Sequence, residues 1–168
     1  MSASNPQRRG MSTRAVFLVI IIVFVLSWIA TAIFGYVIYG NVLKTAKRTD
    51  VALRALTWTA LAYACDHEGR FPSSQDEFFS FYPPPESISC IPTGDASWPT
   101  TRSEVMGDDP LPSDLVYASR KLKLYFASQG DMPPVFDANG MPTELGTIDD
   151  LRQWLDSFSK ANPVSTDS

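Results

Sequence analysis

The chain has 168 residues, 45% of them hydrophobic, and a formal net charge of −4 at pH 7. Residues 1–48 hold six cations and no acid, whereas residues 49–168 hold eight cations and all 18 acids. An acidic domain lacks the clustered Lys and Arg that phosphate contacts require, so we expect no nucleic-acid partner.

A basic N-terminal segment, residues 1–14, precedes a run without charge at residues 15–43. A helix of that length reaches roughly 44 Å, which exceeds the ~30 Å hydrocarbon core of a bilayer. Many residues of the run are β-branched or aromatic and would favour a strand in water, but in lipid only a helix satisfies its own backbone. We therefore predict one transmembrane helix in this segment, near residues 15–39.

The basic residues that flank the span are expected to contact anionic lipid head groups. Lys and Arg are nearly balanced on the two sides, so charge does not set the orientation. A basic head followed by an apolar run is a signal-anchor layout, which favours export of the rest of the chain. Ala30-Thr31-Ala32 also resembles a signal-peptidase site, but the uncharged run continues well beyond it. We expect a single-pass membrane protein with an exported domain.

Residues 44–160 are predicted to form one small soluble domain, and residues 161–168 a flexible tail. From Lys44 to Glu68, apolar residues recur at spacings of three and four and predict an amphipathic helix that continues out of the membrane. The predicted apolar face comprises Leu53, Leu56, Ala60, Tyr63 and His67, widened by Leu61 and Cys65. Gly69 should end this helix, because glycine tolerates the left-handed conformation. The chain then turns at Phe71 and Pro72.

Ser73 and Ser74 precede acidic residues and predict the start of a second helix. Its phenylalanines, Phe78, Phe79 and Phe81, should pack on the long helix. The prolines that follow Tyr82 end this element. Residues 83–113 hold seven of the 13 prolines and predict a long irregular loop, which in a compact domain is usually functional or mobile.

Short alternating segments predict strands at 114–118, 122–126, 135–136 and 141–145. Asn139-Gly140 favours a hairpin turn between the last two. A final helix should begin with a cap at Thr147 and bury Leu151, Trp154, Leu155 and Phe158, before ending at Asn162-Pro163. The predicted fold class is α+β: a transmembrane helix continues into a long helix packed on an antiparallel sheet of three or four strands, with a C-terminal helix.

Both cysteines, Cys65 and Cys90, follow the span. An even number in a small exported domain permits one disulfide, and two buried thiols are the alternative. Asp66-His67-Glu68 is the densest titratable cluster, but helix neighbours point about 100° apart and cannot converge on one ion. The Asp137–Gly140 segment has oxygen ligands suited to calcium, with Asp108-Asp109 as possible partners, although a turn explains it better. The sequence contains no nucleophile elbow or phosphate loop, so we predict neither an enzyme nor a cofactor.

The order of these parts resembles type IV pilin-like proteins, especially the pseudopilins of type II secretion. The local similarity is to the "AL..Y..DNGRYPT" segment that ends the major pseudopilin helix, matched here by Ala55-Leu56, Tyr63, Asp66, Glu68-Gly69-Arg70-Phe71-Pro72 and Ser73. Residues 110–117 and 135–140 also resemble the sheet region of that family. The resemblance implies a pilin-like fold whose aromatic-Pro pair turns the chain from helix to loop.

The N-terminus departs from the family pattern. Gly10-Met11 after two arginines resembles a prepilin processing site, but the fifth mature position is Ala15 rather than Glu, and Arg14 precedes it. The Glu that pairs with a neighbouring subunit's terminal amine is therefore missing. The leading hypothesis is a non-enzymatic structural or assembly subunit of a type II secretion or pilus-like system that forms homo- or hetero-oligomers. The resemblance implies that it is anchored in the cell inner membrane with its domain on the periplasmic side. The alternative is an anchored accessory or sensor domain that binds a protein or small ligand through residues 83–113.

Overall fold

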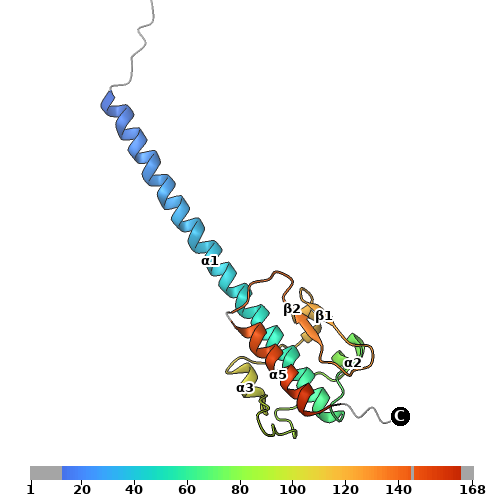
Figure 1. Cartoon of the computed structure of the whole chain (residues 1–168). Coiled ribbons are helices and arrows are strands. Elements are labelled where there is room, and N and C mark those ends of the chain that lie inside the picture. The colour runs from blue at the N-terminus through green and yellow to red at the C-terminus, as the bar shows by residue number, and fades with distance from the viewer. Residues whose placement is uncertain (1–12, 145, 164–168) are drawn as a thin grey trace, which may run out of the picture. The chain divides into compact units, whose positions relative to one another are not determined.

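A computed structural model describes residues 13–144 and 146–163, and its fold is α+β (Figure 1). The chain divides into two compact units, residues 1–41 and 42–168. The elements in chain order are α1 (Thr13–Asp66), α2 (Gln75–Ser80), α3 (Arg102–Met106), α4 (Leu115–Ser119), β1 (Lys123–Tyr125), β2 (Val135–Asp137) and α5 (Thr147–Ala161).

In the first unit, α1 displays its apolar side chains rather than burying them. The large hydrophobic residues from Val16 to Tyr39 are all exposed, and Trp28 has 69% of its surface free. Within the described part of the chain, α1 is the one helix long and apolar enough to cross a membrane. This finding agrees with the predicted span, because a continuous apolar surface of this kind is costly in water and favourable in lipid.

In the second unit, the same helix is buried on nearly all sides. From Ala52 to Ala64, every residue except Arg54 is buried. The predicted helix is therefore present as far as Asp66, and from Ala52 to Ala64 it is buried on more faces than the single one predicted. A helix that is apolar all round belongs inside a core, and the other elements of the domain cover each of its faces.

The C-terminal helix α5 runs alongside the last part of α1, with α3 and the sheet on either side (Figure 1). Leu151, Leu155 and Phe158 of α5 are buried in the common core, as predicted, and Trp154 is half-buried. The predicted cap at Thr147 is wrong: the N-cap residue is Gly146 in the left-handed conformation, without a side-chain hydrogen bond.

The sheet contains two antiparallel strands, fewer than predicted. Lys123 pairs with Asp137, Leu124 with Phe136 and Tyr125 with Val135, so β2 pairs with β1 and not with residues 141–145. Residues 141–144 form no strand, and Leu145 lies outside the described residues. Asn139 and Gly140 do adopt the positive φ values, 52° and 76°, expected of a turn.

The predicted strand at 114–118 is instead helix α4. The side chain of Asp114 accepts a hydrogen bond from the backbone N–H of Tyr117 at 2.8 Å, which caps the helix. Capping of this kind competes with extended structure at short segments, because it satisfies a backbone donor locally.

Helix α2 begins as predicted, with the Ser74 hydroxyl accepting a hydrogen bond from the Glu77 N–H. Phe78 is fully buried, and Phe81 packs edge-on against Tyr63 of α1 with ring centroids 5.4 Å apart. The segment 83–113 has more secondary structure than the loop that was predicted. It contains α3 and a β-bridge between Ser87 and Thr101.

Candidate interaction site at the disulfide-linked segment

A disulfide joins Cys65, in the last turn of α1, to Cys90 in the segment 83–113. The sulfur atoms are 2.13 Å apart and the Cα atoms 5.7 Å. The backbone N–H of Cys90 also donates to the Cys65 sulfur at 3.0 Å. The segment is therefore linked covalently to the end of the core helix.

Indole groups attach the same segment at two further points. The Trp58 Nε1–H donates to the carbonyl of Pro85 at 2.9 Å, and the Trp98 Nε1–H donates to the carbonyl of Cys90 at 3.2 Å. Trp98 is buried and packs edge-on against Phe158 of α5, with centroids 5.1 Å apart. The Tyr82 hydroxyl donates to the carbonyl of Pro112. These contacts hold a proline-rich segment in place without long secondary structure.

Between Cys90 and Trp98 the chain faces solvent. We call residues 91–97 the tip; most of them are exposed, and the side chain of Ile91 retains 74% of its surface. A large exposed apolar side chain between two anchored residues is a suitable contact for a partner protein. The tip is one exposed part of segment 83–113.

The predicted turn residues have a packing role. Gly69 has φ +87°, and a Cβ added there would lie 2.8 Å from the carbonyl oxygen of Asn162. Phe71 is buried, its N–H donates to the carbonyl of Gly130 at 2.9 Å, and its ring packs edge-on against Phe158. Pro72 is also fully buried. The turn thus joins the end of α1 to the end of α5.

Sequence reasoning missed Gly130, which lies against this turn. Its φ is +66°, and an added Cβ would lie 2.3 Å from the carbonyl oxygen of Phe71. The only sequence signal is the glycine itself, which does not reveal its distant partner. A side chain at this position would push the two segments apart.

Glu77 was also missed as the centre of a polar junction at the end of α1. It accepts a hydrogen bond from the Tyr63 hydroxyl and two from Ser73, from the N–H at 2.7 Å and the hydroxyl at 2.8 Å. The Tyr63 and Ser73 bonds lower the pKa of Glu77. Burial, followed by the contact with Glu77, raises the pKa of Tyr63 to about 12.

His67, from the titratable cluster noted in the sequence, belongs to this junction. Its ring stacks on Tyr63 at 3.9 Å with an interplanar angle of 3°. Its Nδ1 lies 2.8 Å from the Tyr63 carbonyl oxygen and must donate, because that oxygen can only accept. Asp66 lies 3.9 Å away, and Glu68 is already in a left-handed turn. Across the described residues, no group of three or more His, Cys, Asp or Glu could hold a metal ion.

Asp109 and Asp137, two of the acidic residues considered for calcium, have other partners. Asp109 forms an ion pair with Lys47 at 2.9 Å, and that contact raises the pKa of Lys47. Asp137 accepts a hydrogen bond from the N–H of Asn139 at 2.7 Å, which forms the turn. These two carboxylates therefore have a structural explanation.

The possible processing site, Gly10 and Met11, lies outside the described residues. A comparison of the chain with models of protein families, with curated proteins and with solved structures found no match.

Proposed function

We propose that the protein is a non-enzymatic, single-pass inner-membrane protein whose exported domain is a structural or assembly subunit of a type II secretion or type IV pilus-like system. The observation that carries the proposal is α1 itself. One uninterrupted helix supplies the exposed apolar segment and the buried core of the domain. A single-chain membrane anchor of this kind suits a protein that acts by contact with other subunits.

Two further observations support the proposal. The Cys65–Cys90 disulfide suits an oxidising compartment, which favours a domain outside the cytoplasm. The titratable groups of the junction around Glu77 are bonded to one another, which favours an architectural role. The assignment to a secretion or pilus-like system rests on the resemblance of the helix end to pseudopilins.

The intact mass of protein extracted from native membranes tests the assembly role. A mature chain that begins at Met11 would mean prepilin processing and membership of a filament system. A chain that begins at Met1 or Ser2 would mean a permanent signal anchor and would contradict the filament form of the proposal. Alkylation before and after reduction tests export, because the disulfide should protect both thiols in native membranes.

A second candidate function is that of a membrane-anchored accessory or sensor protein, which the exposed tip at residues 91–97 favours. The core helix is covered by its own domain, so the tip offers a contact that the helix does not. A photo-crosslinking residue at Ile91 separates the two functions. A ladder of self-products supports an assembly subunit, whereas one foreign product supports an accessory protein; the same residue at buried Val105 is the control.

A further inference from the structure

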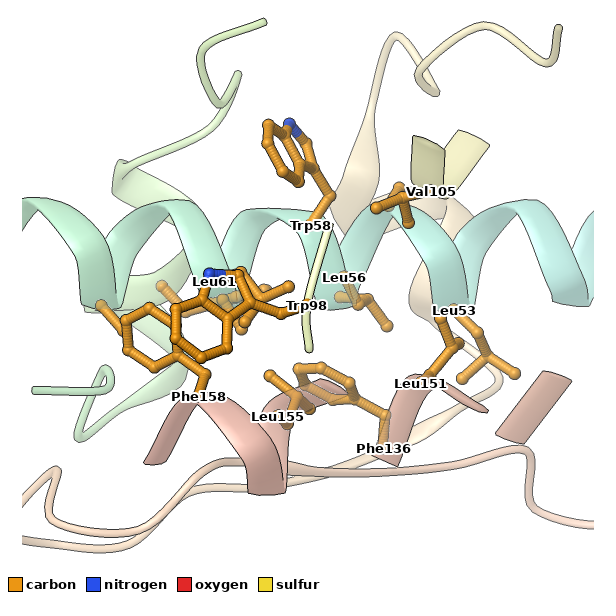
Figure 2. Close-up of a cluster of buried hydrophobic side chains, with 14 of the residues drawn as sticks. Leu53, Leu56, Trp58, Leu61, Trp98, Val105, Phe136, Leu151, Leu155 and Phe158 are labelled. Carbon is orange, nitrogen blue, oxygen red and sulfur yellow. The ribbon is translucent and has the colours of Figure 1, made fainter. Parts of the chain in front are cut away.

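A cavity of about 300 Å³ lies within residues 42–168, between α5 and the segment that carries β2. Apolar side chains from three elements line most of it, including Leu53, Phe136 and Leu155. Figure 2 shows these residues gathered where α5 faces α1. The volume falls at the lower end of the range of about 300–1,000 Å³ that is typical of small-ligand pockets. It can therefore hold a short apolar group.

Polar residues of α5 form one edge of the cavity. They are Arg152, Asp156, Ser159 and Lys160. Arg152 and Lys160 are exposed, and neither forms an ion pair with another residue that the structure describes. Two cations against one carboxylate leave this edge with a net positive charge. An anionic group is the complementary ligand.

Outside α5, Thr57 is the one polar residue that the described part of the chain contributes to the lining. Thr57 contributes to the lining, and its hydroxyl lacks a hydrogen-bond partner among the described residues, but this oxygen has less than 1 Å² of accessible surface. A polar ligand atom placed against the apolar lining would lose its hydration without gaining a partner. A bound ligand must therefore direct its apolar end inward and its charged end toward α5.

We propose that this cavity binds an alkyl carboxylate, a small amphiphile of the fatty-acid type. Its chain would lie against Leu53, Phe136 and Leu155, and its carboxylate would contact Arg152. The planar guanidinium matches a carboxylate with two hydrogen bonds. Lys160 contributes less, because it lies in the last turn of α5, where the helix dipole opposes an anion. This site goes beyond the proposed function, which requires protein contacts alone.

Methyl NMR on the full chain in phosphatidylcholine nanodiscs tests the proposal, with free octanoate as the measured ligand. Met132 lines the cavity, whereas Met106 is buried and lies outside the lining. We expect a saturable shift of the Met132 methyl and none at Met106. Each added CH₂ between hexanoate and octanoate should raise the affinity about fourfold while the cavity still has room. An unresponsive Met132 would overturn the proposal.

Uncharged 1-octanol isolates the contribution of the carboxylate. We expect it to bind more weakly than octanoate, and equal affinities would contradict recognition of the anion. Arg152→Gln should weaken octanoate binding about tenfold or more, the size expected for loss of a charge-assisted hydrogen bond, with no effect on octanol. Lys160→Gln should have a smaller effect. Lys121→Gln, at an exposed cation outside the cavity, is the matched control and should have none.

A cavity-filling variant gives an independent test. Ile148→Trp places a larger side chain in the lining and should abolish the binding of both probes. An unchanged Met106 signal verifies that the core remains folded. If octanoate still binds this variant at full affinity, the ligand does not occupy the cavity.

Discussion

Two stretches of α1 are both apolar but meet different surroundings. The stretch from Val16 to Leu43 exposes its large side chains, whereas the stretch from Ala52 to Ala64 is buried inside the domain. The first is rich in Ile, Val and Phe, and the second contains five alanines, at 52, 55, 60, 62 and 64. Small residues let neighbouring elements approach the second stretch from every side, whereas large ones cover the first with hydrocarbon. Composition within one helix thus separates a surface suited to lipid from a protein core.

The largest expected effect comes from truncating a core leucine. Leu56→Ala should lower the free energy of unfolding of the domain by about 2–5 kcal/mol, because the site is fully buried and leaves a cavity. Leu26→Ala, which removes the same atoms from an exposed position, should leave the domain's unfolding unchanged. Denaturant unfolding followed by near-ultraviolet circular dichroism measures both. Equal losses would show that the two stretches share one environment.

A charge placed in the exposed stretch should weaken membrane insertion and leave the stability of the domain unchanged. Ile22→Lys should disfavour membrane insertion by about 3–4 kcal/mol, because lysine is costly near the centre of a membrane helix and isoleucine is favourable. The domain should unfold as before. Carbonate extraction of membranes reports the change. Full retention of this variant in the membrane fraction, with no loss to the extract, would argue against a span at this position.

The disulfide should stabilise the buried stretch at its C-terminal end. Replacing both Cys65 and Cys90 by Ala should lower the free energy of unfolding by about 2–4 kcal/mol, the usual range for a disulfide. Hydrogen exchange should rise first in the tip, whose anchor at Cys90 is lost. Exchange at residues 16–39 should stay the same. A uniform rise over the whole chain would contradict local anchoring by the disulfide.

The smallest predicted effects are changes of stability at the two ends of the pH scale. The lowered pKa of Glu77 means that its contribution is present above the unfolded value near 4.5 and is lost as the pH falls through the folded value. The pKa of Tyr63 is raised, so its contribution is present below pH 10 and is lost as the pH rises toward about 12.

Unfolding curves of the Tyr63→Phe variant, measured across pH, test the predicted loss of stability at high pH. The variant should lose less stability than the wild type between pH 10 and about 12. Tyr82 also has a pKa raised by burial and is left intact in both proteins, so its contribution cancels. Identical alkaline curves would show that Tyr63 does not contribute to the loss of stability at high pH. Both proteins should show the same stability of the membrane stretch, which lies outside this junction.

Local signals in the sequence predicted several elements correctly. The uncharged run predicted the apolar helix, Ser74 predicted the start of α2, and the spacing of Leu151, Leu155 and Phe158 predicted the buried face of α5. Each signal depends on residues within a few turns of one another. The candidate disulfide partners were identifiable because the chain has only two cysteines.

Tertiary structure decided what depends on distant partners. Ala52–Ala64 became a fully covered core helix because α2, α3, α5 and the sheet pack around it, and periodicity in one segment does not reveal how many neighbours it has. The pairing of β2 with β1 and the contact of Gly130 with Phe71 also join segments far apart in the chain. The sequence by itself determined which segments are apolar and where α2 begins, because hydropathy and capping act locally. Only the packed domain determined which faces are covered, because burial depends on every element that arrives there.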